Sequence, residues 1–490
     1  MNNFIEYLNE INDNRSMLMI LMWEIDTKMP KDSIDYYSDI YSKLENKIFE
    51  MTTSDKYIKL LESAISSDEF NKLEEHKKIY FLNLKEDYEK TKRIPKDFYE
   101  EYTKQRLKSR QVWAEAKEKN DYSIFKPYLE KVINLTKELY SYMYPNSNNL
   151  YDNMLSEFEK GIKSSDIDPL FDELKNEIVP IIKNLKPEKL DNIKREYSES
   201  ELYDISKFLL DYIGFDNNKG ALGIYPHGYT IKMSKNDVRI AFNHTDNVVD
   251  LASTIIHEGG HGIFELYAEK DYDELNMIDV NLTALHESQS RFYENILGRN
   301  INFWVPIYEE FKKKAKLDIS LEKFIKYFND SKVSFIRTEA DELTYCLHII
   351  IRYEIEKEIF NGNIDLDKLP EIWNKKYKDY FGLDVKNDRE GILQDMHWSD
   401  GSFGYFPDYL LGSIFDGMLL ERINEELGDV DTLLRNGKIK EITKYLNNNI
   451  HIYGGSYNIF DTSKRVCKKE LNVGPLVKYF KRKYDRSNNE

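Results

Sequence analysis

The motif His257-Glu258-Gly259-Gly260-His261 constrains the fold most strongly, because its two histidines have the spacing needed to share one metal ion on a helix. If residues 246–269 are helical, side chains four residues apart project from the same face, one turn apart. Glu258 can then face the same ion without binding it, which suits a general base acting on metal-bound water. The alternative is a chance match on a helix with two core histidines.

A catalytic metal site of this type needs a third protein ligand and an open position for water. The predicted third ligand is Glu287, in a second helical segment that runs from about residue 281 to a stop at Gly298. Spacing alone leaves three competitors open, namely Glu265, Glu269 and Glu294. Glu265 lies two turns along the same helix from His257, so it could not easily swing back to the ion. The ligand set predicts one divalent metal ion per chain, Zn²⁺ first, with Co²⁺ or Mn²⁺ also possible.

The rest of the chain has mainly helical patterning. Only 21 Gly and 12 Pro occur in 490 residues, and apolar residues recur at helical spacing over long stretches. Residues 1–215 read as a succession of amphipathic helices, with breaks expected at Pro30, Pro95, Pro145 and Pro187. No repeat or Gly/Ser-rich linker divides the chain. We therefore expect one domain over 1–490, with a helical N-terminal part (1–215) and a catalytic part (216–490).

One convincing β signal precedes the metal-binding helix. Tyr229–Met233 and Asp237–Phe242 have strand length and carry β-branched and aromatic residues, and a polar turn at 234–236 separates them. The predicted hairpin could lie along a cleft and pair with an extended peptide. A purely structural hairpin fits the pattern equally well.

Charge and cysteine content limit the possible partners and compartment. The formal net charge of −17 disfavours nucleic acid or an anionic membrane as a partner. Cys346 and Cys467 are too few for a disulfide framework, the N-terminus lacks a basic leader region, and the apolar run 17–23 is too short to span a bilayer. We expect a soluble, cytoplasmic protein.

An ordered set of further motifs resembles the thermostable-carboxypeptidase family of metallocarboxypeptidases, known as M32 or carboxypeptidase Taq, nearly end to end. Among them are Ile336-Arg337-Thr-Glu-Ala-Asp341, Gly391-Ile-Leu-Gln-Asp-Met-His397-Trp398 and Gly404-Tyr405-Phe-Pro407. The matching blocks are 21–30, 113–116, 120–122, 151–161, 257–261, 286–289, 336–341, 391–398 and 404–407.

The resemblance implies a mainly α fold with a deep central groove and a small hairpin beside the metal-binding helix, as in zincins. It also implies a homodimer, Glu287 as the third ligand, and hydrolysis of the C-terminal bond of peptides that have a free C-terminus. The family's arginine for the terminal carboxylate matches Arg337, and Arg239 is the second choice. Without the resemblance, either arginine would more often pair with an acid, Asp341 or Asp237 respectively.

Other positions are candidates for contact with the substrate. Tyr405 and His397 could donate hydrogen bonds to the oxyanion of the tetrahedral intermediate. His227 and Gln289 complete the predicted substrate-binding set, although Gln289, like Asp341 and Asp395, could instead orient a metal ligand.

Two blocks depart from the family pattern. Ala241 stands where the family has threonine, and Gly228 stands where it has the proline of His-Pro-Phe. We expect altered side-chain preference or a looser loop rather than lost chemistry.

Two rival functions remain. A zinc oligopeptidase would use the same metal site to cut internal bonds and would need no cation for a free carboxylate. A non-catalytic peptide-binding homologue would keep the fold without turnover, and the intact set His257, Glu258, His261 and Glu287 argues against it.

Overall fold

Prolines mark the ends of the N-terminal helices as the sequence predicts. Helix α1 ends at Thr27 before Pro30, α5 ends at Thr91 before Pro95, and α7 ends at Met143 before Pro145. Proline restricts the residue before it and lacks the N–H that the helical ladder needs, which favours a break at these three positions. The computed structural model describes residues 1–186, 190–268, 283–362 and 364–484, and Pro187 lies outside them.

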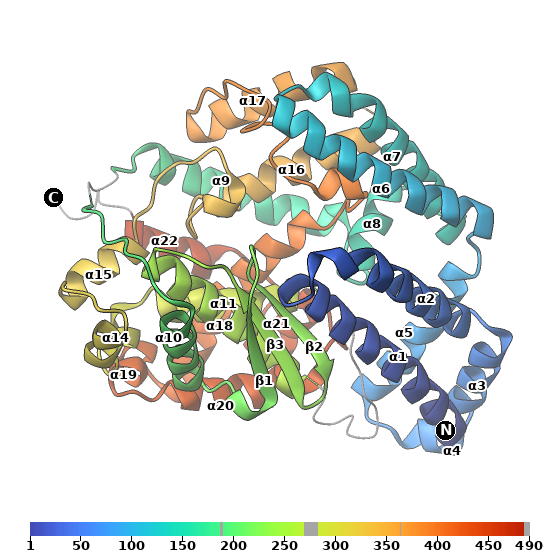
Figure 1. The fold of residues 1–490 in the computed structure, drawn as a ribbon, viewed down its shortest axis with the longest axis horizontal. Helices are drawn as coiled ribbons and strands as arrows, with labels where there is room; N and C mark the ends of the chain where they lie inside the picture. The colour runs from blue at the N-terminus through green and yellow to red at the C-terminus, as the bar shows by residue number, and fades with distance from the viewer. Residues whose placement is uncertain (187–189, 269–282, 363, 485–490) are drawn as a thin grey trace.

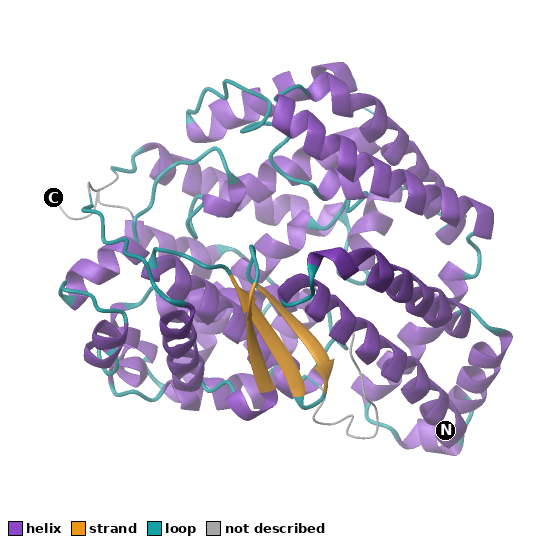
Figure 2. Ribbon diagram, viewed as in Figure 1, coloured by secondary structure: helices purple, strands orange, loops and turns teal. Residues whose placement is uncertain are grey.

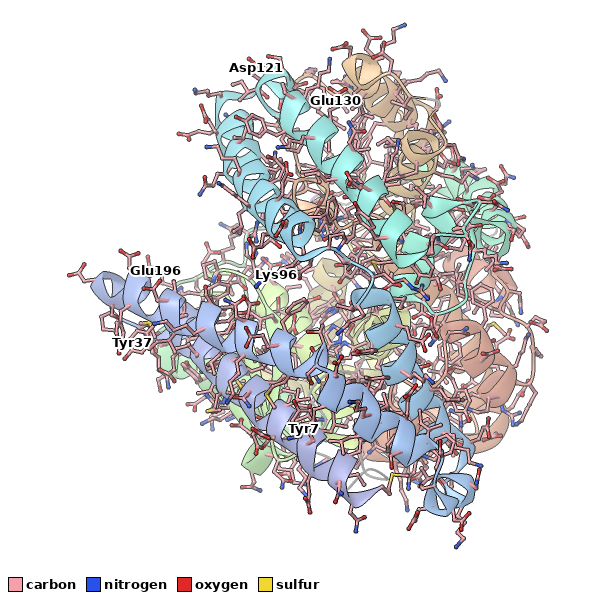
Figure 3. The ribbon with its side chains drawn as sticks, turned by 90° about the vertical axis from the view of Figure 1, so that its right-hand side faces the viewer. Tyr7, Tyr37, Lys96, Asp121, Glu130 and Glu196 are labelled. Atoms are coloured by element: carbon pink, nitrogen blue, oxygen red, sulfur yellow. The ribbon has the colours of Figure 1, made fainter. Side chains whose placement is uncertain are left out.

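The part of the chain before the sheet is helical (Figures 1 and 2). Its elements are α1 (Asn2–Thr27), η1 (Lys31–Ser33), α2 (Ile34–Thr52), α3 (Asp55–Ile65), α4 (Asp68–Lys72), α5 (Glu75–Thr91), α6 (Lys96–Lys119), α7 (Tyr122–Met143), α8 (Leu150–Phe158), α9 (Ser164–Lys183), α10 (Glu199–Ile213) and η2 (Asn217–Lys219). In the side view of Figure 3, the helices that carry Tyr7 and Tyr37 lie below α6 and α7, marked by Lys96, Asp121 and Glu130.

Helices also dominate the second half. After the strands β1 (Gly220–Ile224), β2 (Tyr229–Ser234) and β3 (Asp237–Phe242) come α11 (Val248–Tyr267), α12 (Thr283–Arg291), the π-helix η4 (Phe292–Gly298), α13 (Ile301–Trp304), α14 (Tyr308–Lys314), α15 (Leu321–Phe328), η5 (Arg337–Glu339), α16 (Tyr345–Phe360), η6 (Leu366–Lys368), α17 (Leu369–Phe381), η7 (His397–Asp400), α18 (Phe406–Leu427), α19 (Val430–Arg435), α20 (Ile439–Asn449), η8 (His451–Tyr453), α21 (Ile459–Cys467) and α22 (Gly474–Tyr484). The predicted mainly α fold is confirmed.

The sheet has three strands in the order β1-β3-β2 (Figure 2). The predicted hairpin is present as the antiparallel pair β2 and β3, and β1 adds a parallel strand on the other side of β3. The sequence did not indicate β1, because two of its five residues are glycines. Both glycines admit an aromatic ring: a Cβ on Gly220 would lie 2.4 Å from the Phe215 ring, and one on Gly223 would lie 2.6 Å from the Trp23 ring.

The apolar core consists of one large cluster and two smaller ones. The large cluster extends from Tyr102 on α6 to Phe480 on α22 and so crosses the boundary at residue 215. A second cluster lies among α1, α3, α4 and α5, and a third joins Trp23 of α1 to the sheet. Ala241 belongs to this third cluster and is fully buried, so a hydroxyl at this position would lie inside the protein. None of the described helices has the length and apolar character needed to cross a membrane.

Candidate metal centre and active site

Helix α11 carries the two predicted histidine ligands. Its N-cap residue is Asn247, whose side-chain oxygen accepts a hydrogen bond from Val249 N at 3.1 Å and so caps the first turn. The helix is almost fully buried between the sheet, α10 and α12. Polar side chains in such a setting need a partner or a function.

Gly260 lets α11 and α12 approach closely. A Cβ built on Gly260 would lie 2.7 Å from Ser290 Cα and 2.8 Å from the Gln289 carbonyl oxygen, both in the backbone of α12. Any side chain here would force the two helices apart. The glycine therefore brings Glu287, one turn away on α12, within reach of the histidines.

His257, His261 and Glu287 converge on one point. Each offers one ligand atom such that all three atoms lie within 4.8 Å of one another, and Nε2 of His261 lies 3.6 Å from Oε2 of Glu287. Two imidazoles and one carboxylate are a donor set that Zn²⁺ and similar divalent ions bind, with a further position open to water. The residues present therefore fit a divalent cation.

Two charged residues hold these ligands in place. Glu294, on the π-helix η4, accepts a hydrogen bond from Nδ1 of His257 at 2.9 Å and another from Ser253 Oγ at 2.6 Å. This contact leaves Nε2 of His257 for a metal. Arg291 donates to Oε1 of Glu287 at 2.7 Å, which leaves Oε2 facing His261.

The electrostatics of the metal-free triad follow from this packing. Burial disfavours a charge on His257, but the hydrogen bond to Glu294 and the carboxylate of Glu287 raise its pKa to about 9. Burial and the neighbouring His286 lower the pKa of His261 to about 3. Despite burial, Arg291 and His261 hold the pKa of Glu287 well below its usual range. A neutral His261 and an ionised Glu287 are the forms that bind a metal.

Glu258 follows His257 in the chain and accepts a hydrogen bond from the sheet. Thr230 Oγ1 on β2 donates to its Oε2 at 2.8 Å, and the residue is 6% exposed. Burial raises the pKa of Glu258. A Cβ on Gly228 would lie 3.0 Å from Oε1 of Glu258, so the β1–β2 connection closes over this carboxylate.

The competing carboxylates are engaged elsewhere or not described. Glu265 accepts from Nε2 of His286 at 2.9 Å and lies 3.8 Å from Lys232 Nζ. Glu294 accepts a hydrogen bond from Nδ1 of His257, as described above. Glu269 falls outside the described residues. The geometry therefore favours Glu287 as the third ligand.

His397 of η7 stacks near Tyr405, the residue that precedes α18. Their ring centroids are 5.7 Å apart, and Tyr405 also packs edge-on against Phe158 at 5.2 Å. Burial raises the pKa of Tyr405 to about 12, so its phenol keeps its proton. Burial lowers the pKa of His397 to about 4, and its buried Nδ1 has no hydrogen-bond partner among the described residues. Both side chains are neutral donors at physiological pH.

Arg337 is buried and pairs with a different acid from the one expected. Its Nε donates to Oδ1 of Asp395 at 3.1 Å and its Nη1 donates to Tyr345 Oη at 2.8 Å. Asp341, the partner anticipated from sequence proximity, instead caps the backbone N–H groups of Leu343 and Thr344 at 3.0 Å. Separation in sequence did not identify a partner that the fold brings from 58 residues away.

The other three substrate-binding candidates occupy different environments. Arg239 forms a close pair with Asp237, with contacts of 2.8 and 3.0 Å, as the ion-pair alternative proposed. His227 is exposed on the β1–β2 connection next to Gly228. Gln289 is fully buried; its oxygen lies 2.8 Å from Nε2 of His451 and its nitrogen donates to Ser288. A peptide could not reach it, so we do not retain Gln289 as a substrate contact.

The comparisons with known proteins agree with this geometry. Residues 3–484 match the family model described as carboxypeptidase Taq (M32) metallopeptidase. The chain belongs to the M32 metallopeptidase family. It is 36% identical over 492 residues to carboxypeptidase 1 of Bacillus subtilis (strain 168), covering 98% of this chain and 97% of that protein.

Solved M32 structures have the same fold. The structure of Pyrococcus furiosus carboxypeptidase superposes with a TM-score of 0.92 at 27% identity, and that of the M32 carboxypeptidase from Deinococcus radiodurans R1 with 0.93 at 26%. Each match covers 99% of this chain and 98% of the other. The predicted family is confirmed, and with it the assignment of the chain as a metallocarboxypeptidase that requires a divalent metal.

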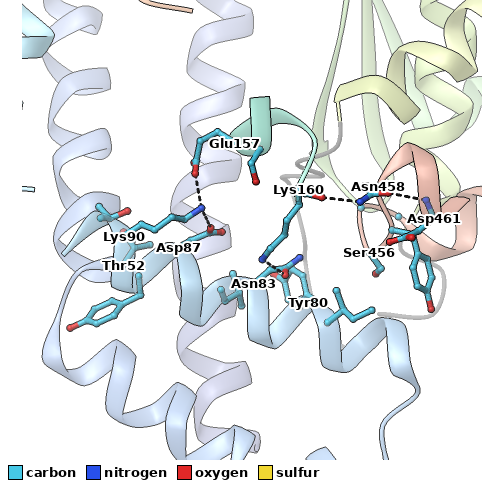
Figure 4. Close-up of a pocket in the computed structure, with 18 of the residues that line it drawn as sticks. Thr52, Tyr80, Asn83, Asp87, Lys90, Glu157, Lys160, Ser456, Asn458 and Asp461 are labelled. Atoms are coloured by element: carbon cyan, nitrogen blue, oxygen red, sulfur yellow. Dashed lines mark hydrogen bonds and ion pairs between the residues drawn. The ribbon is translucent and has the colours of Figure 1, made fainter. Parts of the chain in front are cut away.

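This M32 protein also has a cavity of about 930 Å³ (Figure 4). One wall comes from α5 with Asn83 and Lys90, another from Glu157 of α8, and a third from residues 454–465. Phe158, which follows Glu157 in the chain, contacts Tyr405 but does not line the cavity. Its described lining residues include none of the three candidate metal ligands.

Sequence reasoning missed several residues that shape the site. Arg291 follows Glu287 by four residues on a helix, and this spacing alone could have indicated the contact. Its position in the sequence makes Glu294 a competing ligand, whereas in the structure it orients the ligand His257. Thr230 and Arg352 carried no local signal, because their partners come from distant parts of the chain.

Proposed function

We propose that the protein removes C-terminal residues from peptides one at a time, with Zn²⁺ held by His257, His261 and Glu287. The convergence of these three ligand atoms beside the buried Glu258 carries the proposal. The spacing, the burial and the orienting contacts from Glu294 and Arg291 are those a catalytic metal site requires.

Within this site Glu258 is the general base. A divalent metal at the triad supplies a Lewis acid that lowers the pKa of water and polarises the scissile carbonyl. Glu258 accepts the proton of the attacking water and then delivers it to the leaving amine. Thr230 holds one carboxylate oxygen at 2.8 Å, so the other stays available for this transfer.

Arg337 is the proposed partner of the substrate's terminal carboxylate. A planar guanidinium matches both carboxylate oxygens, and this one lies in a buried setting where an ionic contact is strong. Tyr405 and His397 are the proposed oxyanion donors, because both are buried, neutral and carry an N–H or O–H.

Mass spectrometry of a mixed peptide pool tests the proposal. Each peptide is offered as the free acid and as the C-terminal amide to the zinc-loaded protein, with Glu258→Gln as the matched inactive control. We expect successive single-residue losses from the free acids alone, and none in the control. Arg337→Ala should lower kcat/KM for free acids by about 100-fold or more, the effect of losing a buried charge contact.

The rival functions give different results. Internal cuts on both acid and amide forms, with Arg337→Ala unchanged, would establish the oligopeptidase. Peptide binding without turnover in Zn²⁺, Co²⁺ or Mn²⁺ would establish the non-catalytic homologue.

Metal identity, assembly and compartment are separate proposals. We propose Zn²⁺ as the resident metal, to be tested by elemental analysis of protein purified without added metal. We propose a homodimer on the family resemblance, to be tested by light scattering. We propose a cytoplasmic location, which suits two buried free cysteines, Cys346 and Cys467.

A further inference from the structure

Arg337 shares its acidic partner with a second buried arginine. Asp395 faces Arg337 through Oδ1, with Nε and Nη2 each 3.1 Å away, and faces Arg352 of α16 through Oδ2, with Nε at 2.6 Å. Arg352 is fully buried and also donates to Gln394 Oε1 at 2.8 Å and to the His348 carbonyl at 2.6 Å. Each oxygen of the carboxylate therefore serves one guanidinium.

The hydrogen bonds of Arg337 leave donors for a ligand. A guanidinium has five N–H groups. The Nε and Nη2 atoms face Asp395, and Nη1 donates to Tyr345. One N–H on each terminal nitrogen remains without a partner among the described residues, and this pair matches the two oxygens of a carboxylate.

The charges of this cluster do not cancel. Arg337 and Arg352 contribute two positive charges, and Asp395 is the one acid that forms an ion pair with either of them in the described part of the chain. Burial keeps the nearby His348 and His397 neutral by lowering the pKa of each. Glu356, one turn from Arg352, accepts from Tyr151, Trp398 and the Gly404 backbone instead. The cluster is left with a net positive charge, which is costly to bury without a counter-ion.

The Arg239 pair shows the contrast. Arg239 contacts both carboxylate oxygens of Asp237, so its charge is matched within the protein. Without Arg352, Asp395 would match Arg337 in the same way, and little attraction for an incoming anion would remain.

We infer that Arg352 is a positioning residue that determines specificity: by taking up the charge of Asp395, it leaves Arg337 free to bind the substrate's terminal carboxylate. The inference rests on the proposed role of Arg337. It predicts that recognition of the free C-terminus depends on the charge balance among Arg337, Arg352 and Asp395. Of these, the fully buried Arg352 cannot touch the peptide.

A charge-balance series tests this. Arg352→Met should raise KM for free-acid peptides about 30-fold or more, leave kcat within about threefold, and bring kcat/KM for acids toward the value for amides. Adding Asp395→Asn to Arg352→Met removes the now surplus negative charge and keeps an oxygen for Arg337. The double variant should recover at least tenfold in KM. Arg352→Lys, which retains the charge, should lie between wild type and Arg352→Met.

The outcomes distinguish failure of the proposed carboxypeptidase function from failure of the inference about Arg352. If wild type cleaves acids and amides alike, the proposed carboxypeptidase function fails. If wild type discriminates but Arg352→Met discriminates equally, the inference about Arg352 fails while the function stands. A merely structural Arg352 would make the double variant worse than the single one, with kcat and the melting temperature falling together, and this result would also overturn the inference.

Discussion

The carboxylate of Glu294 holds the imidazole of His257 in one orientation and adds negative charge behind it. Glu294→Gln isolates the charge, because the amide oxygen can still accept from His257 while the amide nitrogen donates to Ser253. We expect the affinity for Zn²⁺ to fall about 10-fold, since such outer contacts typically contribute 10- to 100-fold. Competition with a chromophoric chelator measures it, and unchanged affinity would show that the orientation of His257 alone matters.

The role of a single residue can be read from its neighbours in sequence in some cases and not in others. His257, Glu258 and His261 are identifiable because the spacing of the motif and the geometry of a helix set their relation. The partner of Arg337 could not be read in the same way: Asp341 is close in sequence and Asp395 is the residue in contact. Local spacing determines contacts within one helix, whereas contacts between elements depend on how those elements pack.

At the scale of elements, the approach of α11 to α12 depends on Gly260. Gly260→Ala would place a Cβ 2.7 Å from the α12 backbone, which cannot yield without moving the helix. We expect a loss of about 2 kcal/mol or more in the free energy of unfolding, together with weaker metal binding as Glu287 moves away. Urea denaturation of the metal-free and zinc-loaded forms measures both effects.

Gly259→Ala is the matched control for this prediction. It lies in the same motif, but its Cβ would meet only the ends of the Ile213 and Leu210 side chains, at 2.5 and 2.8 Å. These side chains can change rotamer, so the loss of stability should be clearly smaller. Equal losses for the two variants would contradict the role given to the α11–α12 contact.

Elements with a strong hydrophobic periodicity are predictable from the sequence. Elements whose residues are determined by packing against other parts of the chain are not. The metal helix was expected over 246–269 and spans Val248–Tyr267, and the hairpin strands lie within a residue of their predicted bounds. Strand β1 was missed because its glycines are selected by the rings of Phe215 and Trp23 rather than by strand propensity. The π-helix η4 likewise has no sequence signal, yet it places Glu294 behind His257.

At the scale of the whole molecule, Glu356 links parts of the chain that are distant in sequence. It lies on α16 and accepts hydrogen bonds from Tyr151 Oη of α8 at 3.0 Å, from Trp398 Nε1 of η7 at 2.7 Å and from the Gly404 backbone before α18 at 2.9 Å. These contacts hold the loop that presents Tyr405. The carboxylate is fully buried, so its protonation is coupled to the folding of the entire helical body.

This coupling predicts a pH-dependent stability. Burial raises the pKa of Glu356 to about 7, above its ordinary value of 4.5. A carboxyl with a raised pKa in the folded state stabilises that state below the unfolded pKa, and the contribution is lost as pH rises through the folded pKa. Between about pH 5.5 and pH 8 this one group should therefore remove about 2 kcal/mol from the free energy of unfolding.

Glu356→Gln should flatten the pH profile of urea denaturation of the metal-free protein by that amount, at some cost in stability at every pH. Glu358→Gln, on the exposed side of the same helix, is the control and should leave the slope unchanged. A slope in Glu356→Gln as steep as in wild type would assign the pH dependence to other buried carboxyls, of which Glu159, with a pKa raised by burial to about 7, is the next to test.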